Sequence, residues 1–185
     1  MNIGEQICGE WLRHIGRCEF IQYNLKPPGI QGEIDVIGIN LGDRTVYACE
    51  VAIHLITGLQ YVKDRRPDNV PRLTTKFGKD VVYIQKAFPE YKHVFMLWSP
   101  VVKNQKTGAK NNQVRDVQQV VEIVKKKFGV IIQPVINEVF QAKLVELRQA
   151  AKDENAELDS SVMRFLQVEE HLTLHLKRGK EKGKS

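Results

Sequence analysis

The sequence predicts an α/β fold in which helices flank a mixed β-sheet. Helical and strand-like patterns follow one another in the order α, three strands, α, β, α, β, α, α, with no internal repeat or low-complexity segment before residue 177. The run HVFMLWSP, residues 93–100, is almost uniformly apolar, as expected for a central strand with both faces covered. These observations indicate a single domain over residues 1–176, with additional C-terminal helices after the last strand.

The first third of the chain predicts one helix and a three-stranded meander. Apolar residues recur with helical spacing over residues 2–15, and Gly16 follows where a C-terminal cap is expected. Turn-forming segments, KPPG and NLGDR, then separate three β-prone runs, which are residues 18–24, 33–39 and 45–53.

The remaining elements alternate between helix and strand. Asn69 is a candidate helix cap, with Pro71 in the first turn of a helix that runs to about Phe88. After the strand at 93–100 we expect a helix ended by Gly129, a fifth strand and two further helices, at residues 114–128, 130–136, 137–151 and 159–176.

Charge is concentrated near the end of the chain. The formal net charge is +6 and the pI is about 9.2, which favours a polyanionic partner such as nucleic acid, although a solvated basic surface gives the same sum. The last nine residues, KRGKEKGKS, hold five Lys or Arg against one Glu. We therefore expect residues 177–185 to form a basic flexible tail on a nearly neutral body.

The three cysteines follow no metal-ligand spacing and no CxxC pattern. Cys8 and Cys49 lie inside apolar-periodic segments, which favours buried free thiols in a reducing compartment. No run approaches the ~18 apolar residues of a membrane span. We therefore expect a cytoplasmic protein with no membrane partner.

Two acidic residues interrupt the apolar runs of neighbouring strands. Side chains alternate faces along a strand, so if the second and third strands pair through NLGDR, Asp35 and Glu50 come within reach of one ion. Carboxylate pairs of this kind bind Mg²⁺, which can activate a water for phosphate chemistry. The alternative is that both acids are solvent-facing residues of a half-exposed sheet, although an unpaired buried carboxylate would be costly.

These residues resemble a known family. The segments GEIDVIG and VYACEV are similar to the GEID…EVK signature of the restriction-endonuclease-like PD-(D/E)XK superfamily, especially its small endonuclease-like proteins and archaeal Holliday-junction resolvases. Glu5 precedes Gly16 by eleven residues, as in that family, and Asn24 in QYN matches a strand motif of the small endonuclease-like group. The resemblance covers residues 4 to about 54.

The resemblance implies a metal site and a nuclease fold. Glu5, Asp35 and Glu50 would be its acidic ligands, the Val51 carbonyl a further ligand, and Mg²⁺, or Mn²⁺, the cofactor. It also implies a catalytic lysine two residues after Glu50, but Ala52 occupies that position.

Several replacements for the lysine remain open. Lys76 on the following helix is the first candidate and Lys63 the second, because the superfamily tolerates migration of this residue. His54 shares a strand face with Glu50, and its ordinary pKa near 6.5 suits proton transfer. Gln60 is a candidate supporting residue of the active site. Alternatively the activity is lost, by natural decay or by an engineered Lys→Ala change.

The sequence therefore favours a metal-dependent DNA endonuclease or exonuclease that hydrolyses phosphodiester bonds. The alternative is a catalytically inactive nucleic-acid-binding module that keeps the nuclease fold. A third reading is an α/β interaction protein with fortuitous acidic residues. Dimerisation is common in the nuclease fold because two strands need cutting, so a homodimer is a further expectation.

Overall fold

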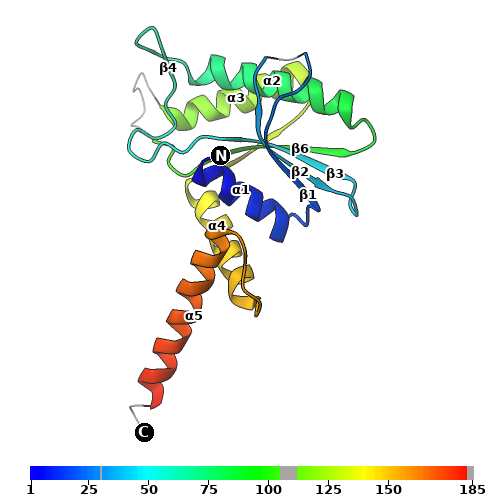
Figure 1. Cartoon of the computed structure of the whole chain (residues 1–185). Coiled ribbons are helices and arrows are strands. Elements are labelled where there is room, and N and C mark those ends of the chain that lie inside the picture. Colours follow the sequence, from blue (N-terminus) through cyan, green and yellow to red (C-terminus); the bar gives the residue numbers. More distant parts are fainter. Residues whose placement is uncertain (30, 105–111, 183–185) are drawn as a thin grey trace.

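A computed structural model describes residues 1–29, 31–104 and 112–182 of the chain, and these residues form a mixed α/β fold (Figure 1). A five-stranded sheet is flanked by five helices, so the predicted fold class is confirmed. The helices are α1 Ile3–His14, α2 Asn69–Ala87, α3 Gln113–Phe128, α4 Asn137–Asp153 and α5 Ser161–Lys182. The strands are β1 Phe20–Leu25, β2 Ile34–Asn40, β3 Thr45–Val51, β4 Val62–Lys63, β5 Arg66–Pro67, β6 Lys92–Ser99 and β7 Ile132–Ile136.

The sheet has the strand order β1-β2-β3-β6-β7. The meander β1-β2-β3 is antiparallel, and the pairs β3-β6 and β6-β7 are parallel because α2 and α3 return the chain between them. In β6 every residue from Val94 to Ser99 is buried, which confirms the central strand expected from its uniform apolar composition.

Helices cover both faces of the sheet (Figure 1). On one face α2 and α3 bury an apolar cluster that includes Leu73, Phe77 and Val120. On the other face α1 and α4 bury a second cluster, in which the rings of Trp11 and Trp98 lie 5.7 Å apart. The three cysteines are buried and free, as the sequence predicts.

Capping interactions explain where α1 begins and where α3 ends. At the start of α1, the Asn2 side chain accepts hydrogen bonds from the Gly4 and Glu5 N–H groups, and the Glu5 carboxylate accepts one from the Asn2 N–H, forming a capping box. At the end of α3, Gly129 adopts a left-handed conformation with φ 73°, as expected of a C-terminal cap.

Asn69 does not cap α2 as predicted. It is the first residue of the helix, and its buried side chain accepts from the Tyr61 N–H at 2.7 Å and donates to the Leu59 carbonyl at 3.0 Å and to Asp116 at 2.8 Å. These partners lie outside the helix, so tertiary contacts override the local capping preference. Its side chain fastens the segment after β3 to the start of α2.

Two segments expected to be irregular are regular. The polar connection before α2 forms a two-stranded ribbon of β4 and β5. Helix α5 continues through Lys182, so it includes most of the segment 177–185 that we expected to be a flexible tail. Residues 183–185 lie outside the described part. Among the helices that the structure describes, none is long and apolar enough to cross a membrane.

Candidate active site

The register of β2 and β3 sets the two predicted acids side by side. Val36 pairs with Cys49 and Ile37 with Ala48, so one step further Asp35 lies opposite Glu50. Directly opposed residues of an antiparallel pair point to the same face of the sheet. Both carboxylates therefore face the layer of α2 and α3.

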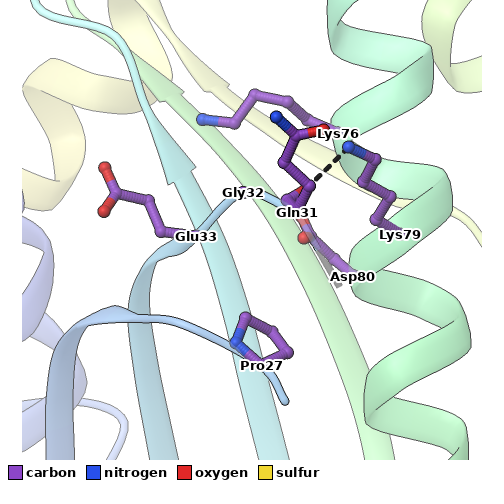
Figure 2. Close-up of a pocket in the computed structure, with 7 residues that line it drawn as sticks. All are labelled: Pro27, Gln31, Gly32, Glu33, Lys76, Lys79 and Asp80. Atoms are coloured by element: carbon purple, nitrogen blue, oxygen red, sulfur yellow. Dashed lines mark hydrogen bonds between the residues drawn. The ribbon is translucent and has the colours of Figure 1, made fainter. Parts of the chain in front are cut away.

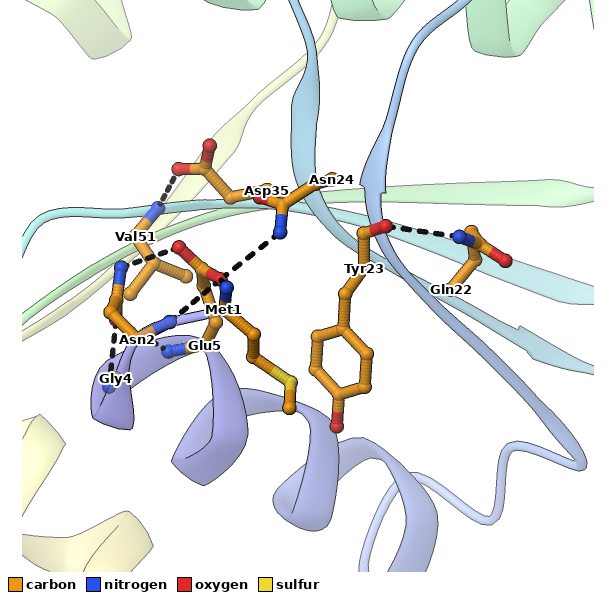
Figure 3. A network of polar contacts seen from close by, with 9 residues as sticks. All are labelled: Met1, Asn2, Gly4, Glu5, Gln22, Tyr23, Asn24, Asp35 and Val51. Atoms are coloured by element: carbon orange, nitrogen blue, oxygen red, sulfur yellow. Dashed lines mark hydrogen bonds and ion pairs between the residues drawn. The ribbon is translucent and has the colours of Figure 1, made fainter.

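Hydrogen bonding at the end of the ladder fixes the Asp35 side chain. Its Oδ2 accepts a hydrogen bond from the Val51 N–H at 2.7 Å, in a buried position where β2 begins (Figure 3). A carboxylate that accepts a main-chain bond is oriented without using a second side chain. The other oxygen, Oδ1, remains available to groups from α2.

Lys76 of α2 reaches both acids. Its Nζ lies 3.4 Å from Asp35 Oδ1 and forms an ion pair with Glu50 Oε2. The helix places it there because Leu73 and Phe77, on either side of Lys76 along the chain, are buried against the sheet. An ammonium group from α2 thus lies between the two carboxylates, whereas position 52 of the chain holds Ala52.

Asp80 is a further carboxyl group in this cluster, which the sequence analysis did not identify. It lies one helical turn after Lys76, is 5% exposed, and is close enough to Glu50 that each carboxyl group acts on the pKa of the other. Glu50 Oε1 and Asp80 Oδ2 are buried with no hydrogen-bond donor among the described groups. The sequence does contain a signal for the burial of Asp80, because Asp80 lies on the same apolar face of the helix as Phe77 and Ile84.

Burial and crowding of like charges shift the titration of the cluster. Burial raises the pKa of Asp80 to about 7. Burial, followed by the charges of Asp80 and Asp35, raises the pKa of Glu50 well above its usual value. Burial alone would lower the pKa of Lys76, but the charges of Glu50 and Asp35 outweigh it and raise that pKa. One ammonium faces three carboxyl groups, so the protonated forms of Glu50 and Asp80 are favoured relative to those of free side chains.

A small pocket of about 50 Å³ adjoins the cluster (Figure 2). Its walls come from α2, through Lys76, Lys79 and Asp80, and from the connection between β1 and β2. Lys79 Nζ donates to the Gln31 carbonyl at 2.6 Å, which ties that connection to α2. The pocket gives the cluster an opening that is bordered by two lysines.

Glu5 belongs to a neighbouring network (Figure 3). Its carboxylate accepts from the Asn2 N–H at 3.0 Å and from Asn24 Nδ2 at 3.4 Å, so the family-like residues Glu5 and Asn24 do meet. Within residues 1–29, 31–104 and 112–182, no group of three or more His, Cys, Asp or Glu side chains is placed to hold a metal ion. The roles of Glu5 and of the Val51 carbonyl as metal ligands therefore stay predictions.

The other candidate residues, His54, Lys63 and Gln60, have described surroundings that differ from those of Lys76. The His54 ring packs edge-on against Tyr61, with centroids 5.7 Å apart, and Lys63 is exposed on β4. Gln60 lines a separate pocket with Asn69. Of Lys76, Lys63 and His54, it is Lys76 whose side chain contacts the acids in the described part of the chain.

Tyr61 and Ala52 border the cluster. Burial raises the pKa of the Tyr61 phenol, and the charges of Lys76 and Glu50 also act on it, which places it near the ion pairs. Ala52 is 3% exposed and packs in the same apolar cluster as Leu73 and Phe77. Position 52 is thus a packing position in this protein.

Comparison of the chain with protein-family models, curated proteins and solved structures gave no match.

The donor set itself bears on the implied Mg²⁺. Mg²⁺ in proteins is commonly bound through one or two carboxylates, with waters and substrate phosphate completing its octahedron. Asp35 and Glu50 are two such hard oxygen donors on one face, and Glu50 Oε1 is buried without a partner. These residues fit a divalent cation with few protein ligands.

Proposed function

We propose that the protein is a metal-dependent nuclease that hydrolyses phosphodiester bonds in DNA. The observation that carries the proposal is the meeting of Asp35, Glu50 and Lys76 at one point, from two strands and a helix. Two carboxylates and a lysine are the side chains that metal-dependent phosphodiester hydrolysis would use in this proposal. Here the lysine comes from α2, whereas the motif position holds Ala52.

Asp35 and Glu50 would hold Mg²⁺ or Mn²⁺. When bound, such an ion polarises the phosphate and activates a water for attack. The chain prepares the site before any ion arrives, because the Val51 N–H fixes Asp35 and the strand register fixes Glu50 opposite it. Carboxylate ligands bind in their deprotonated form, so the raised pKa values of Glu50 and Asp80 make ion binding weaken as the pH falls.

Lys76 acts as a positive charge and hydrogen-bond donor in this proposal. Its pKa is raised by Glu50 and Asp35 against the effect of burial, so it stays protonated at neutral pH. A protonated lysine orients a water or stabilises charge on a phosphate oxygen, and it does not take a proton. His54 remains the candidate base, although the described contacts place it beside Tyr61.

The charge of the chain supports a nucleic-acid substrate. The formal net charge is +6, of which residues 177–185 contribute +4, and the pocket beside the acids is bordered by Lys76 and Lys79 as well as by Glu33 and Asp80. The proposal includes DNA as the partner and a cytoplasmic location.

The experiment is incubation of the full chain with supercoiled plasmid, single-stranded DNA and branched DNA, in Mg²⁺, in Mn²⁺ and in EDTA. Cleavage of at least one form with either metal, and none in EDTA, supports the nuclease. DNA binding without cleavage supports the inactive binding module, and the absence of both metal and DNA binding supports an interaction protein. The matched control is the Glu50→Gln chain, which removes ligand charge with little change of volume.

A further inference from the structure

The two-stranded ribbon of β4 and β5 projects from the body beside the start of α2 (Figure 1). Every residue of the segment 62–67 is exposed. The base of the ribbon is fixed, because the Tyr61 N–H donates to Asn69 Oδ1 at 2.7 Å and the Asp68 N–H donates to the Tyr61 carbonyl at 2.8 Å. The ribbon is therefore held in place at its base and has no apolar core of its own.

The exposed part of the ribbon is basic. The segment 62–67 contains Lys63, Arg65 and Arg66 and a single acid, Asp64. Within the part of the chain that the structure describes, none of these three basic side chains forms an ion pair. Lys63 pairs directly with Arg66 across the strands, and like charges in opposite positions destabilise a strand pair. Since two strands alone are marginally stable in water, this arrangement of charge opposes the folding of the ribbon.

The turn of the ribbon is unfavourable for the same segment. Asp64 and Arg65 connect the two strands, and their φ angles of 50° and 60° lie in the left-handed region. Two-residue hairpin turns with positive φ at both positions favour Asn and Gly, and an arginine is uncommon there. Arg65 therefore stands at the tip at a conformational cost, as residues at functional sites often do.

The base of the ribbon adjoins the candidate active site. Burial raises the pKa of the Tyr61 phenol, and the charges of Lys76 and Glu50 also act on that pKa. At ~3.3 Å per residue, the tip at Arg65 lies no more than about 13 Å from Tyr61. A phosphate follows every ~3.4 Å of helix axis along each DNA strand, so the tip reaches phosphates within roughly four nucleotides of a bond held near Tyr61.

We propose that the β4–β5 ribbon binds the phosphate backbone of duplex DNA beside the bond held at the candidate active site. A phosphate near Lys63 and Arg66 offsets the repulsion between them, and the guanidinium of Arg65 donates to phosphate oxygens. Contacts of this kind position the duplex and read no sequence. The choice of DNA as the polyanion rests on the proposed function, whereas the basic ribbon itself does not.

Binding of a short labelled duplex, measured by fluorescence anisotropy in EDTA at several salt concentrations, tests the proposal without cleavage. Arg65→Gly and Asp64→Gly form a matched pair, because each places a glycine at a left-handed position of the same turn and they change the charge in opposite directions. Arg65→Gly should bind about tenfold more weakly at ~0.1 M salt and lower the slope of log affinity against log salt by about 0.9. Asp64→Gly should bind at least as tightly as wild type. Equal affinities of the two variants, or a wild-type chain that binds no duplex, would overturn the proposal.

Urea unfolding separates DNA binding from a structural role of Arg65. Glycine adopts positive φ without the steric cost of a side chain, so the two glycine variants should unfold at the same urea concentration. A loss of stability in Arg65→Gly that Asp64→Gly does not share would show that the arginine serves the fold, and the proposal would be wrong.

The ribbon and the nuclease function fail separately. If wild type cleaves no DNA but Arg65→Gly still weakens binding, the ribbon stands as a DNA-binding surface and the nuclease does not. If wild type cleaves DNA and Arg65→Gly binds it with unchanged affinity, the nuclease stands and the ribbon proposal is overturned.

Discussion

Lys76 of α2 forms an ion pair with Glu50 of β3, whose side chain is 2% exposed. The same ammonium lies 3.4 Å from Asp35, the residue opposite Glu50 in the strand ladder. A helix therefore brings a cation to the place between two carboxylates where the family pattern would bring one from β3. Under the proposed function this contact assigns Lys76 a role that can be tested separately from that of the proposed metal ligands, Asp35 and Glu50.

We expect Lys76→Ala to lower the rate of metal-dependent DNA cleavage by about 10²–10³-fold, the usual cost of removing a donor that stabilises developing charge. The control is Lys86→Ala, which removes an exposed lysine from the last turn of α2. Initial rates of plasmid nicking measure both. Equal rates in Lys76→Ala and wild type would show that the cation at the acids has no catalytic role.

A lysine at position 52 should compensate for the loss of Lys76. Position 52 follows Glu50 by two residues, and Ala52 packs near Leu73 and Phe77, so its side chain points into the layer from which Lys76 comes. We expect Ala52→Lys to restore part of the cleavage in the Lys76→Ala chain and to add nothing to the wild type. A large gain from Ala52→Lys in the wild-type background would mean that Lys76 does not replace the motif lysine.

The pH dependence of the free energy of unfolding should reflect the raised pKa of the buried Asp80. Its pKa is raised from 3.8 to about 7 in the folded protein, so folding favours its protonated form. Its contribution to stability is fully present below about pH 4, falls as the pH rises to about 7, and is constant above that. Asn resembles the protonated carboxyl group, so Asp80→Asn should gain stability relative to wild type over this window, by on the order of 4 kcal/mol at pH 8.

Urea unfolding of both chains between pH 4 and pH 8 measures this difference. A difference that is the same at every pH would mean that Asp80 titrates normally in the folded protein. Because the carboxyl group of Glu50 is also buried and its pKa is raised, Glu50→Gln should show a trend of the same sign.

The end of α3 supplies a test of the fold. Gly129 has φ 73°, so Gly129→Ala should destabilise the protein by about 1–2 kcal/mol although nothing lies within 4 Å of the added Cβ. Gly42 is the control, because its φ is not left-handed and an added Cβ would meet Asn40 Oδ1 at an ordinary 3.5 Å. The midpoints of thermal unfolding of the two alanine variants are compared. Equal midpoints would contradict the explanation from the left-handed backbone conformation of Gly129.

Periodicity and turn chemistry predicted most of the fold because they report local physics. The apolar spacing in α1, the uniformly apolar β6 and Gly129 after α3 each carry a signal within a few residues. Asn69 was misassigned because its partners, Leu59 and Asp116, are distant in sequence.

The site was only partly predictable for the same reason. Asp35 and Glu50 follow from strand parity, since pairing through a short turn is local. The contact of Lys76 with them depends on how α2 lies across the sheet, which no local pattern determines, so Lys76 was one of three candidates. Asp80 does carry a local signal, because it is an acidic residue on the apolar face of α2.

Metal-dependent cleavage by the wild-type, Asp35→Asn and Glu50→Gln chains tests the central claim most directly. Each substitution removes ligand charge with little change of volume, and circular dichroism confirms that each variant is folded. Wild-type protein is expected to cleave at least one DNA form in Mg²⁺ or Mn²⁺, and both variants are expected to lose detectable cleavage. Cleavage at the wild-type rate by folded Asp35→Asn or Glu50→Gln would contradict it.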